Sequence, residues 1–158
     1  MVASVQIRVL KNPNRYDLDP QRVDEALDFA AAAILNANRL RIQQGRNPRG
    51  QPHRASQRAR DTGGVTLVDT GSLLRSVTVL RPQSTQPGNV NTRVITVDPT
   101  ARNSKTGIPV LQYARAHQFG LGNLPKREFL GIAQRDVTEA SRVFFNLLQR
   151  AVTQSPQT

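Results

Sequence analysis

The sequence predicts an α+β domain in which a small antiparallel sheet packs against two long amphipathic helices, with a long arginine-rich loop between the elements. Residues 2–10 alternate between apolar and polar side chains, and two later runs, 76–82 and 92–99, are strand-like. Two other stretches, 20–44 and 133–152, carry apolar residues at spacings of three and four. Alternation is typical of half-buried strands, and 3-4 spacing is typical of amphipathic helices. The expected order is therefore strand, helix, loop, two strands and a final helix.

The first strand and the first helix are the most regular part of the pattern. In VASVQIRVL, we expect Val5, Ile7 and Val9 on one face of a strand. Asp19-Pro20 is typical of a helix N-cap followed by proline at the first helical position. The next apolar residues form one stripe, which consists of Val23, Leu27, Ala30, Ile34 and Ala37. We expect a helix over about 20–44, ended by Gly45.

Residues 45–66, GRNPRGQPHRASQRARDTGGVT, are the most polar part of the chain. From Arg39 to Arg60 there are seven arginines and no acidic residue. Gly, Pro, Ser and Gln make up much of the rest, which favours a long, flexible basic loop. Such a loop can fold onto DNA or an acidic partner, or it can be a solvated insertion, and both interpretations stay open. The candidate contact residues are Arg46, Arg49, Arg54, Arg58 and Arg60.

The second half of the chain predicts a β-hairpin and a C-terminal helix. SVTVLRP (76–82) and TRVITVDP (92–99) are strand-like, and the turn-rich QSTQPGNVN joins them. After a further loop, GIPVLQYARAHQFG leads into the glycine-rich LGNLP. The apolar face of the last helix consists of Val137, Ala140, Phe144, Leu147 and Ala151. We expect one domain over 1–152 and a frayed tail over 153–158.

Composition limits the classes of function. The 158 residues suffice for one core, with an apolar fraction of 37% and a mean hydropathy of −0.47. No apolar run is long enough to cross a bilayer and the N-terminus has no signal-peptide core, so we expect no membrane partner. The absence of cysteine excludes disulfides and thiolate metal sites, and two histidines alone are too few for a zinc site. We expect neither a metal nor another cofactor.

The charge is strongly positive. The formal net charge is +11, and nineteen of the 22 basic residues are arginine. Arginine favours bidentate pairing with phosphates or carboxylates. This surplus favours a polyanionic neighbour, either nucleic acid or an acidic protein surface, and a stand-alone, sequence-nonspecific DNA-binding protein is one alternative. A generally basic protein without a specific polyanion is another.

The stretch LVDTGSLL (67–74) resembles the catalytic loop of aspartic proteases. Those enzymes need two carboxylates that share one proton, so a single DTG requires a homodimer in which each copy contributes Asp69. Such proteases are almost entirely β, whereas this chain devotes two long stretches to helices. We therefore interpret DTG as a turn in which Asp69 or Thr70 caps a short helical segment and Gly71 relaxes the backbone. Leu73 and Leu74 then enter the core.

Other catalytic chemistry finds little support. His117 stands in YARAHQFG without a carboxylate or nucleophile nearby in sequence, which is more typical of a hydrogen-bonded structural residue. Glu128 is flanked by Lys126 and Arg127, which favours an ion pair over an acid catalyst. The LGNLP segment lacks the Lys-Ser/Thr pair that follows a phosphate-binding glycine loop. The expectation is that the protein is not an enzyme.

Four motifs, taken in order, carry a family resemblance. They are G-x-x-P-x-G (45–50), L-V-D-T-G-S-L-L-x-S (67–76), Y-A-x-x-H-Q-F-G (113–120) and L-P-x-R-E-F-L-G (124–131), followed by an amphipathic helix. This set resembles the virion morphogenesis family of tailed bacteriophages, the tail-completion and neck proteins of Mu-like and P2-like phages. The resemblance covers about residues 20–150, and the ordered set is more specific than any one motif.

The resemblance implies a small α+β subunit of a closed ring at the head–tail junction of the virion, assembled in the cytoplasm of the bacterial host. The ring is expected to be hexameric, with a dodecamer as the alternative. Its expected partners are adjoining neck or connector proteins, tail tube proteins and the genomic DNA, which passes through the lumen by non-specific contact.

The resemblance also directs attention to individual residues. Arg127 and Glu128 are candidates for polar contacts that organise the glycine-rich turn or cross a subunit boundary, and an ion pair within one subunit is the alternative. We expect Tyr113, His117 and Phe119 to fix the segment that leads into that turn. The residues assigned to structural motifs are Asp69, Thr70, Gly71, Leu73, Leu74, Tyr113, His117, Phe119, Gly120 and Pro125.

Overall fold

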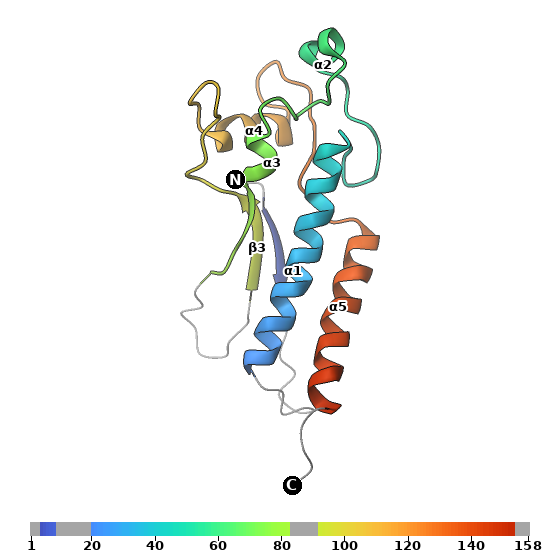
Figure 1. Ribbon diagram of the computed structural model, residues 1–158. Coiled ribbons are helices and arrows are strands. Elements are labelled where there is room, and N and C mark those ends of the chain that lie inside the picture. Colours follow the sequence, from blue (N-terminus) through green and yellow to red (C-terminus); the bar gives the residue numbers. More distant parts are fainter. Residues whose placement is uncertain (1–3, 9–19, 83–91, 154–158) are drawn as a thin grey trace.

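The computed structural model describes residues 4–8, 20–82 and 92–153, and its architecture is mixed α+β, as predicted (Figure 1). The strands are β1 (Ser4–Arg8), β2 (Val77–Leu80) and β3 (Thr92–Val97). The helices are α1 (Pro20–Gln43), α2 (Gln57–Thr62), α3 (Ser72–Ser76), α4 (Val110–Phe119) and α5 (Gln134–Thr153). The predicted N-cap at 19, the position of Val9 and the expected frayed end over 154–158 lie outside the described residues.

The three strands form one antiparallel sheet in the order β1-β3-β2. In the register, Val5 of β1 and Val79 of β2 both stand opposite Ile95 of β3. Val5 is buried and its neighbours Ser4 and Gln6 are exposed, as the alternation predicted. β3 is the central strand, and its alternate residues Ile95 and Val97 are almost fully buried. β2 and β3 pair antiparallel, as the predicted hairpin requires, and its connecting residues 83–91 lie outside the described residues.

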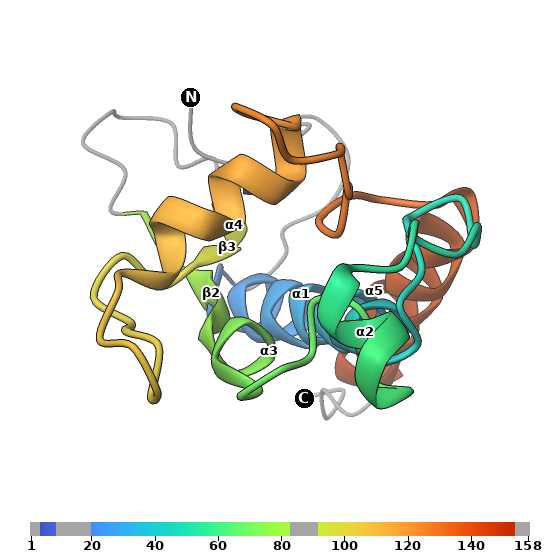
Figure 2. The same cartoon turned by 90° about the horizontal axis from the view of Figure 1, so that it is seen from above.

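The two long helices were predicted to within a few residues and lie side by side. They run in opposite directions, and α1 lies between the sheet and α5 (Figures 1 and 2). Small side chains make this close packing possible, since Ala26, Ala30 and Ala31 of α1 are at most 3% exposed. A helix that contacts other elements on two sides needs a wide apolar face. The alanine-rich sequence of α1 supplies that face without bulk.

A buried ion pair joins the two helices near one end. The Arg41 guanidinium donates from Nη1 to both carboxylate oxygens of Asp136, at 2.9 and 2.7 Å, and from Nη2 to the Gly131 carbonyl at 3.0 Å. The side chains of Arg41 and Asp136 are only 1% and 2% exposed. Next to them, Asn38 accepts a hydrogen bond from the Gly131 amide at 3.1 Å. These contacts fix the chain where it enters α5.

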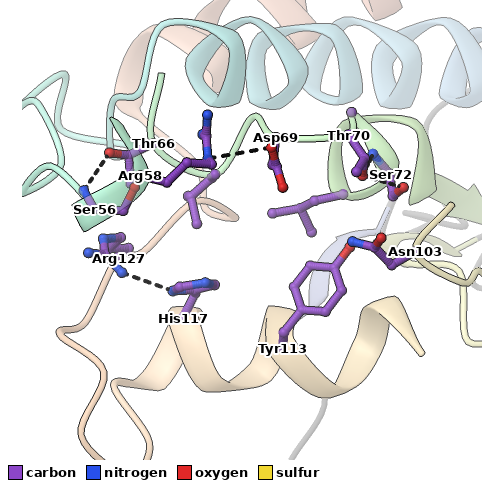
Figure 3. A pocket seen from close by; sticks show the side chains of 13 residues that line it. Ser56, Arg58, Thr66, Asp69, Thr70, Ser72, Asn103, Tyr113, His117 and Arg127 are labelled. Carbon is purple, nitrogen blue, oxygen red and sulfur yellow. Dashed lines mark hydrogen bonds and ion pairs between the residues drawn. The ribbon is translucent and has the colours of Figure 1, made fainter. Parts of the chain in front are cut away.

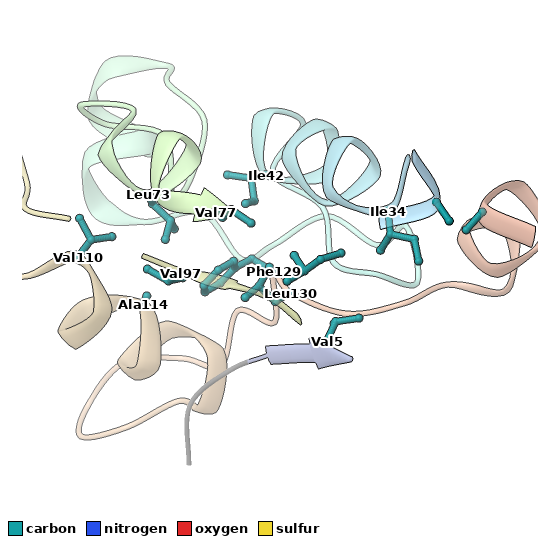
Figure 4. Close-up of a cluster of buried hydrophobic side chains, with 13 residues drawn as sticks. Val5, Ile34, Ile42, Leu73, Val77, Val97, Val110, Ala114, Phe129 and Leu130 are labelled. Carbon is teal, nitrogen blue, oxygen red and sulfur yellow. The ribbon is translucent and has the colours of Figure 1, made fainter. Parts of the chain in front are cut away.

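The apolar core lies between α1, the sheet, α3, α4 and an extended segment at 129–131 (Figure 4). Phe129 is fully buried and Leu130 is 3% exposed, although neither belongs to a helix or a strand. Leu73 is buried and Leu74 is partly buried against the same cluster, in agreement with their predicted place in the core. The segment therefore completes the core beside β3 and α1.

Two helices were not predicted. The sequence 107–120 predicts no helix, but Val110–Phe119 forms α4, which buries Val110, Ala114 and Gln118. The predicted loop 45–66 contains α2, which begins where Ser56 Oγ accepts the Ala59 N–H at 3.1 Å. Among the described residues, no helix combines the length and apolar character needed to cross a membrane. We call the part of the molecule that contains α2, α3, α4 and their connecting loops the apical end (Figure 1).

Candidate functional site

A pocket of about 270 Å³ lies at the apical end, between the DTG segment and α4 (Figure 3). Three of the four sequence motifs contribute to its wall, although they are far apart in the chain. The DTG motif lines one side, α4 lines the other, and the segment after α4 and the start of α2 close one end. The polar side chains that argue for a site here are Arg58, Asp69, Thr70, Tyr113, His117 and Arg127.

The DTG segment forms a tight turn at the start of α3. Gly71 occupies the N-cap position with φ of +73°, a left-handed conformation that favours glycine. Because glycine has no side chain, no side-chain cap forms at this position. Thr70 Oγ1 instead accepts a hydrogen bond from the Ser72 N–H at 3.3 Å and lies 2.7 Å from Ser72 Oγ. The predicted turn is therefore present, with Thr70 rather than Asp69 as the hydrogen-bond acceptor.

Asp69 faces Arg58 instead of capping the helix. Its Oδ1 lies 3.5 Å from Arg58 Nε, and the two side chains are 54% and 34% exposed. Arg58 also donates from Nη2 to the carbonyls of Val65 at 2.7 Å and Val68 at 3.0 Å. Arg58 therefore ties α2 to the turn that precedes the DTG motif. Of the two predicted capping residues, Asp69 does not bond to the start of α3, because the N-cap is Gly71 and Asp69 lies two positions before it.

On the opposite wall, His117 contacts Arg127. Arg127 Nη1 lies 3.2 Å from His117 Nδ1 (Figure 3). A guanidinium only donates hydrogen bonds, so Nδ1 is the acceptor and the imidazole is neutral, with its proton on Nε2. Burial lowers the pKa of His117, and the nearby charge of Arg127 lowers it further. His117 therefore acts as a neutral acceptor that orients the guanidinium.

Arg127 is nearly buried, with 5% of its surface exposed. Its Nε donates to the Arg54 carbonyl at 3.1 Å, which attaches the segment after α4 to the arginine-rich segment. Burial lowers the pKa of Arg127, and the charges of Arg54 and Arg60 lower it further. His53 also lies near Arg127. Burial lowers the pKa of His53, and the charge of Arg127 lowers it further. We call Arg54, Arg60 and Arg127, with His53 and His117, the cationic cluster.

Tyr113 closes the far end of the pocket. Its side chain is partly buried on α4 and its hydroxyl bonds to the side chain of Asn103 (Figure 3). Burial raises the pKa of Tyr113. At this end, the Ser104 amide also donates to Ser72 Oγ at 3.1 Å. The loop around 103–104 is thereby joined to both α3 and α4.

Gln118 is the most important structural residue that sequence reasoning missed. Its Oε1 accepts hydrogen bonds from the amides of Phe129 at 3.0 Å and Leu130 at 3.1 Å, and its Nε2 donates to the Leu130 carbonyl at 2.9 Å. One side chain therefore satisfies three backbone groups of a buried segment that has no strand partner. Its position beside His117 in the motif was the available signal, but the prediction named only its neighbours Tyr113, His117 and Phe119, as residues that fix the segment leading into the glycine-rich turn.

The end of α4 agrees only in part with the prediction. Gly120 is the C-cap with φ of +69°, and a Cβ at this position would lie 3.1 Å from the Lys126 backbone nitrogen. The left-handed conformation and the close approach of Lys126 favour glycine at this turn, in agreement with its predicted structural role. Phe119, however, is 39% exposed and does not anchor the segment. Pro125 is partly buried in the same loop.

The five arginines predicted to contact a partner differ in what they bind within the chain. Arg58 holds the turn before DTG, as described above. Arg46 donates to the Gly50 carbonyl at 2.7 Å and Arg60 donates to Gln57 Oε1 at 2.5 Å. Arg49 and Arg54 expose their side chains. Within the described part of the chain, only Arg58 of these five has an acidic side chain within ion-pair distance.

Arg127 and Glu128 do not pair with each other in the described structure. The guanidinium of Arg127 turns inwards, as described above, while Glu128 Oε2 lies 3.8 Å from Lys126 Nζ. The Lys126 and Glu128 side chains are 61% and 40% exposed. Successive residues in an extended segment point to opposite sides, which explains the different surroundings of 127 and 128. The predicted ion pair of Glu128 therefore forms with Lys126.

Chemically, the pocket offers several hydrogen-bond donors and one carboxylate, that of Asp69. An aspartic protease dyad would need a second carboxylate from another copy of the chain. In the part of the chain that the structure covers, no three His, Asp or Glu side chains gather closely enough to hold a metal ion. Comparisons with protein-family models, with curated proteins and with solved structures find no match to this chain.

Proposed function

We propose that this protein is a structural subunit of a tailed-phage virion that assembles into a closed ring at the head–tail junction. In this function it completes the neck or the tail end and makes head–tail joining possible, with the genome passing through the lumen. A ring of identical subunits needs a rigid scaffold and surfaces that contact neighbours. The sheet with α1 and α5 supplies the scaffold, and the apical end supplies the contact surfaces.

The observation that carries the proposal is that the resemblance motifs gather at the apical end. Segments 45–50, 67–76, 113–120 and 124–131 are distant in sequence, and the last two are joined directly by hydrogen bonds between Arg127 and His117 and between Leu130 and Gln118. Two arginines that lie between the first two motifs link the remaining parts, since Arg58 donates to the Val68 carbonyl and the Arg54 carbonyl accepts from Arg127. A chance collection of short motifs has no reason to meet in space. The contacts of Arg58, Arg127 and Gln118 described above are those that join the segments, which supports treating the motif set as one functional surface.

The apical end also presents side chains suited to contact with other molecules. The end of α4 and the loop after it expose three apolar residues within six positions, namely Phe119 at 39%, Leu121 at 49% and Leu124 at 41%. Exposed apolar groups that cluster are typical of protein–protein contacts. The arginines around α2 add charge that suits acidic patches on adjoining neck, connector or tail tube proteins, or the phosphates of the genome.

The proposal is tested by counting copies of this protein in purified virions of the source phage. Quantitative mass spectrometry against the major tail subunit is expected to give a small fixed number, about six or twelve, as closed-ring symmetry requires. Absence from finished particles, with normal amounts in the lysate, would refute a structural function. A large copy number comparable with that of the major tail subunit would also contradict a ring at one junction.

A stand-alone DNA-binding protein is the second candidate, because Arg46, Arg49, Arg54 and Arg60 have no acidic partner in the described structure. This function predicts that the isolated protein binds DNA with an affinity that falls steeply with salt. Fluorescence anisotropy with a DNA duplex measures that slope. Replacing Arg49 and Arg54 by Gln is expected to reduce the slope by about two if both contact phosphates. Arg142→Gln, a change on the exposed face of α5, is the matched control.

A further inference from the structure

Three arginines are buried in the described part of the chain, and one of them has no carboxylate partner. Arg41 is 1% exposed and forms an ion pair with Asp136. Arg93 is 3% exposed and forms ion pairs with Asp24, at 2.7 Å, and with Asp28. Arg127 is 5% exposed, yet no acidic side chain of the described residues lies within ion-pair distance. A buried charge without a counter-charge is costly. Arg41 and Arg93 have carboxylate partners within the chain, whereas Arg127 has none among the described residues.

The groups around Arg127 supply no negative charge and add further positive charge. Its two hydrogen-bond partners, the Arg54 carbonyl and His117 Nδ1, are neutral acceptors. The charges that act on it come from Arg54 and Arg60, both of the same sign. His53, close to the same group, has an Nε2 that is buried without a hydrogen-bond partner. The cationic cluster is therefore a place of positive potential that an anion would stabilise.

Arg127 is accessible from the pocket, and a second arginine stands on the facing wall. Arg58 lines the same pocket as Arg127 (Figure 3). The one carboxylate in the lining, Asp69, lies 3.5 Å from Arg58 and so offsets the charge of Arg58 rather than that of Arg127. Donors from Thr70 and Tyr113 are also available in the wall. The charged lining groups, Arg58, Asp69 and Arg127, leave a net charge of +1 because His117 is neutral.

We propose that this pocket is a carboxylate-binding site, in which Arg127 receives an acidic side chain presented by a partner protein. A guanidinium and a carboxylate form strong, charge-assisted hydrogen bonds, and Arg127 Nη2 has no hydrogen-bond partner in the described structure. A pocket of about 270 Å³ admits one acidic side chain, whereas the phosphates of a rigid duplex cannot enter it to reach a group that is 5% exposed. The site stands independently of the function proposed above.

The test is an NMR titration of the ¹⁵N-labelled protein with sodium acetate, at an ionic strength held constant with sodium chloride. The Nε–Hε resonance of Arg127 and the amides of the DTG segment are expected to shift and saturate, with a dissociation constant in the millimolar range. Arg127→Gln is expected to weaken binding at least about tenfold. Arg102→Gln is the matched control, since Arg102 is exposed, has no acidic partner and bonds only to the Gly107 carbonyl.

The outcomes separate the possibilities. Saturable shifts in the wild type and in Arg102→Gln that vanish in Arg127→Gln support the site. Unsaturable shifts at Arg127, or equal shifts in both variants, overturn it. Should Arg127→Gln fail to fold, the wild-type resonance still decides, because it either saturates with acetate or does not. A parallel titration with a DNA oligonucleotide tests the source of the anion, and a stronger response of Arg127 to DNA than to acetate would refute a carboxylate from a protein.

Discussion

Replacing Asp136 by Asn should destabilise the protein severely, because the buried ion pair with Arg41 has no access to water. Asp136 uses two oxygens to accept from Arg41 Nη1 at 2.9 and 2.7 Å and from the Ala133 amide at 2.9 Å. Oδ2 alone accepts from both Arg41 Nη1 and the Ala133 amide, so the asparagine oxygen can keep these two bonds, but the asparagine NH₂ group then replaces Oδ1 and places a donor against the Arg41 donor. The change leaves the 1%-exposed guanidinium of Arg41 without a counter-charge. Removing one partner of such a pair costs about 3–5 kcal/mol.

Urea unfolding followed by circular dichroism measures this loss as a change in the free energy of unfolding. Arg41→Met should also destabilise the protein, because the buried Asp136 carboxylate then keeps only the exposed Arg135, whose Nε lies 3.8 Å from Oδ1, as a counter-charge. The double change Arg41→Met with Asp136→Leu should recover much of the loss, because no buried charge remains. Arg142→Gln is the control on the same helix, where the pair with Glu139 is exposed and little effect is expected. Single variants that each cost less than about 1 kcal/mol would refute the reasoning.

Three further outcomes follow from the site. The pKa values of His53 and His117 are lowered in the folded chain. The unfolded chain therefore binds more protons, and the free energy of unfolding should decrease as the pH falls below the ordinary value of 6.5, which urea unfolding at several pH values measures. Gln118→Ala should cost about 2–5 kcal/mol because it leaves buried backbone groups unsatisfied, whereas the exposed Gln112→Ala should change stability by less than about 0.5 kcal/mol. Asp69→Asn should cost at most about 1 kcal/mol in the same assay, because the pair with Arg58 is partly exposed, and a much larger loss would contradict that assignment.

The reasons for the missed elements are physical. The buried residues of α4 are Val110, Ala114 and Gln118, which are spaced by four as in a helix. The third of them is polar and is held by hydrogen bonds to the distant segment at 129–130, so the apolar stripe is too short to indicate a helix from the sequence. α2 is only six residues long and lies among glycine and proline, so its composition is that of a loop. Its Ser56 cap was the signal that local reasoning could have used.

The sequence by itself determined the fold class, the two long helices and the β-hairpin. Apolar periodicity is a local property, and burial of one face is enough to choose between a helix and a strand. It also identified, from short motifs, most of the residues that line the pocket, among them Asp69, Thr70, Tyr113, His117 and Arg127.

Only the tertiary structure decided how those residues act. Asp136 lies 95 positions from Arg41, and Arg54 lies 73 positions from Arg127, so no local pattern connects them. Ion pairing and desolvation depend on distance in space and on exclusion of water, which arise only when the chain is packed. For the same reason, the sequence presents Arg127 as one arginine among many, whereas the fold makes it a buried cation without a carboxylate of its own.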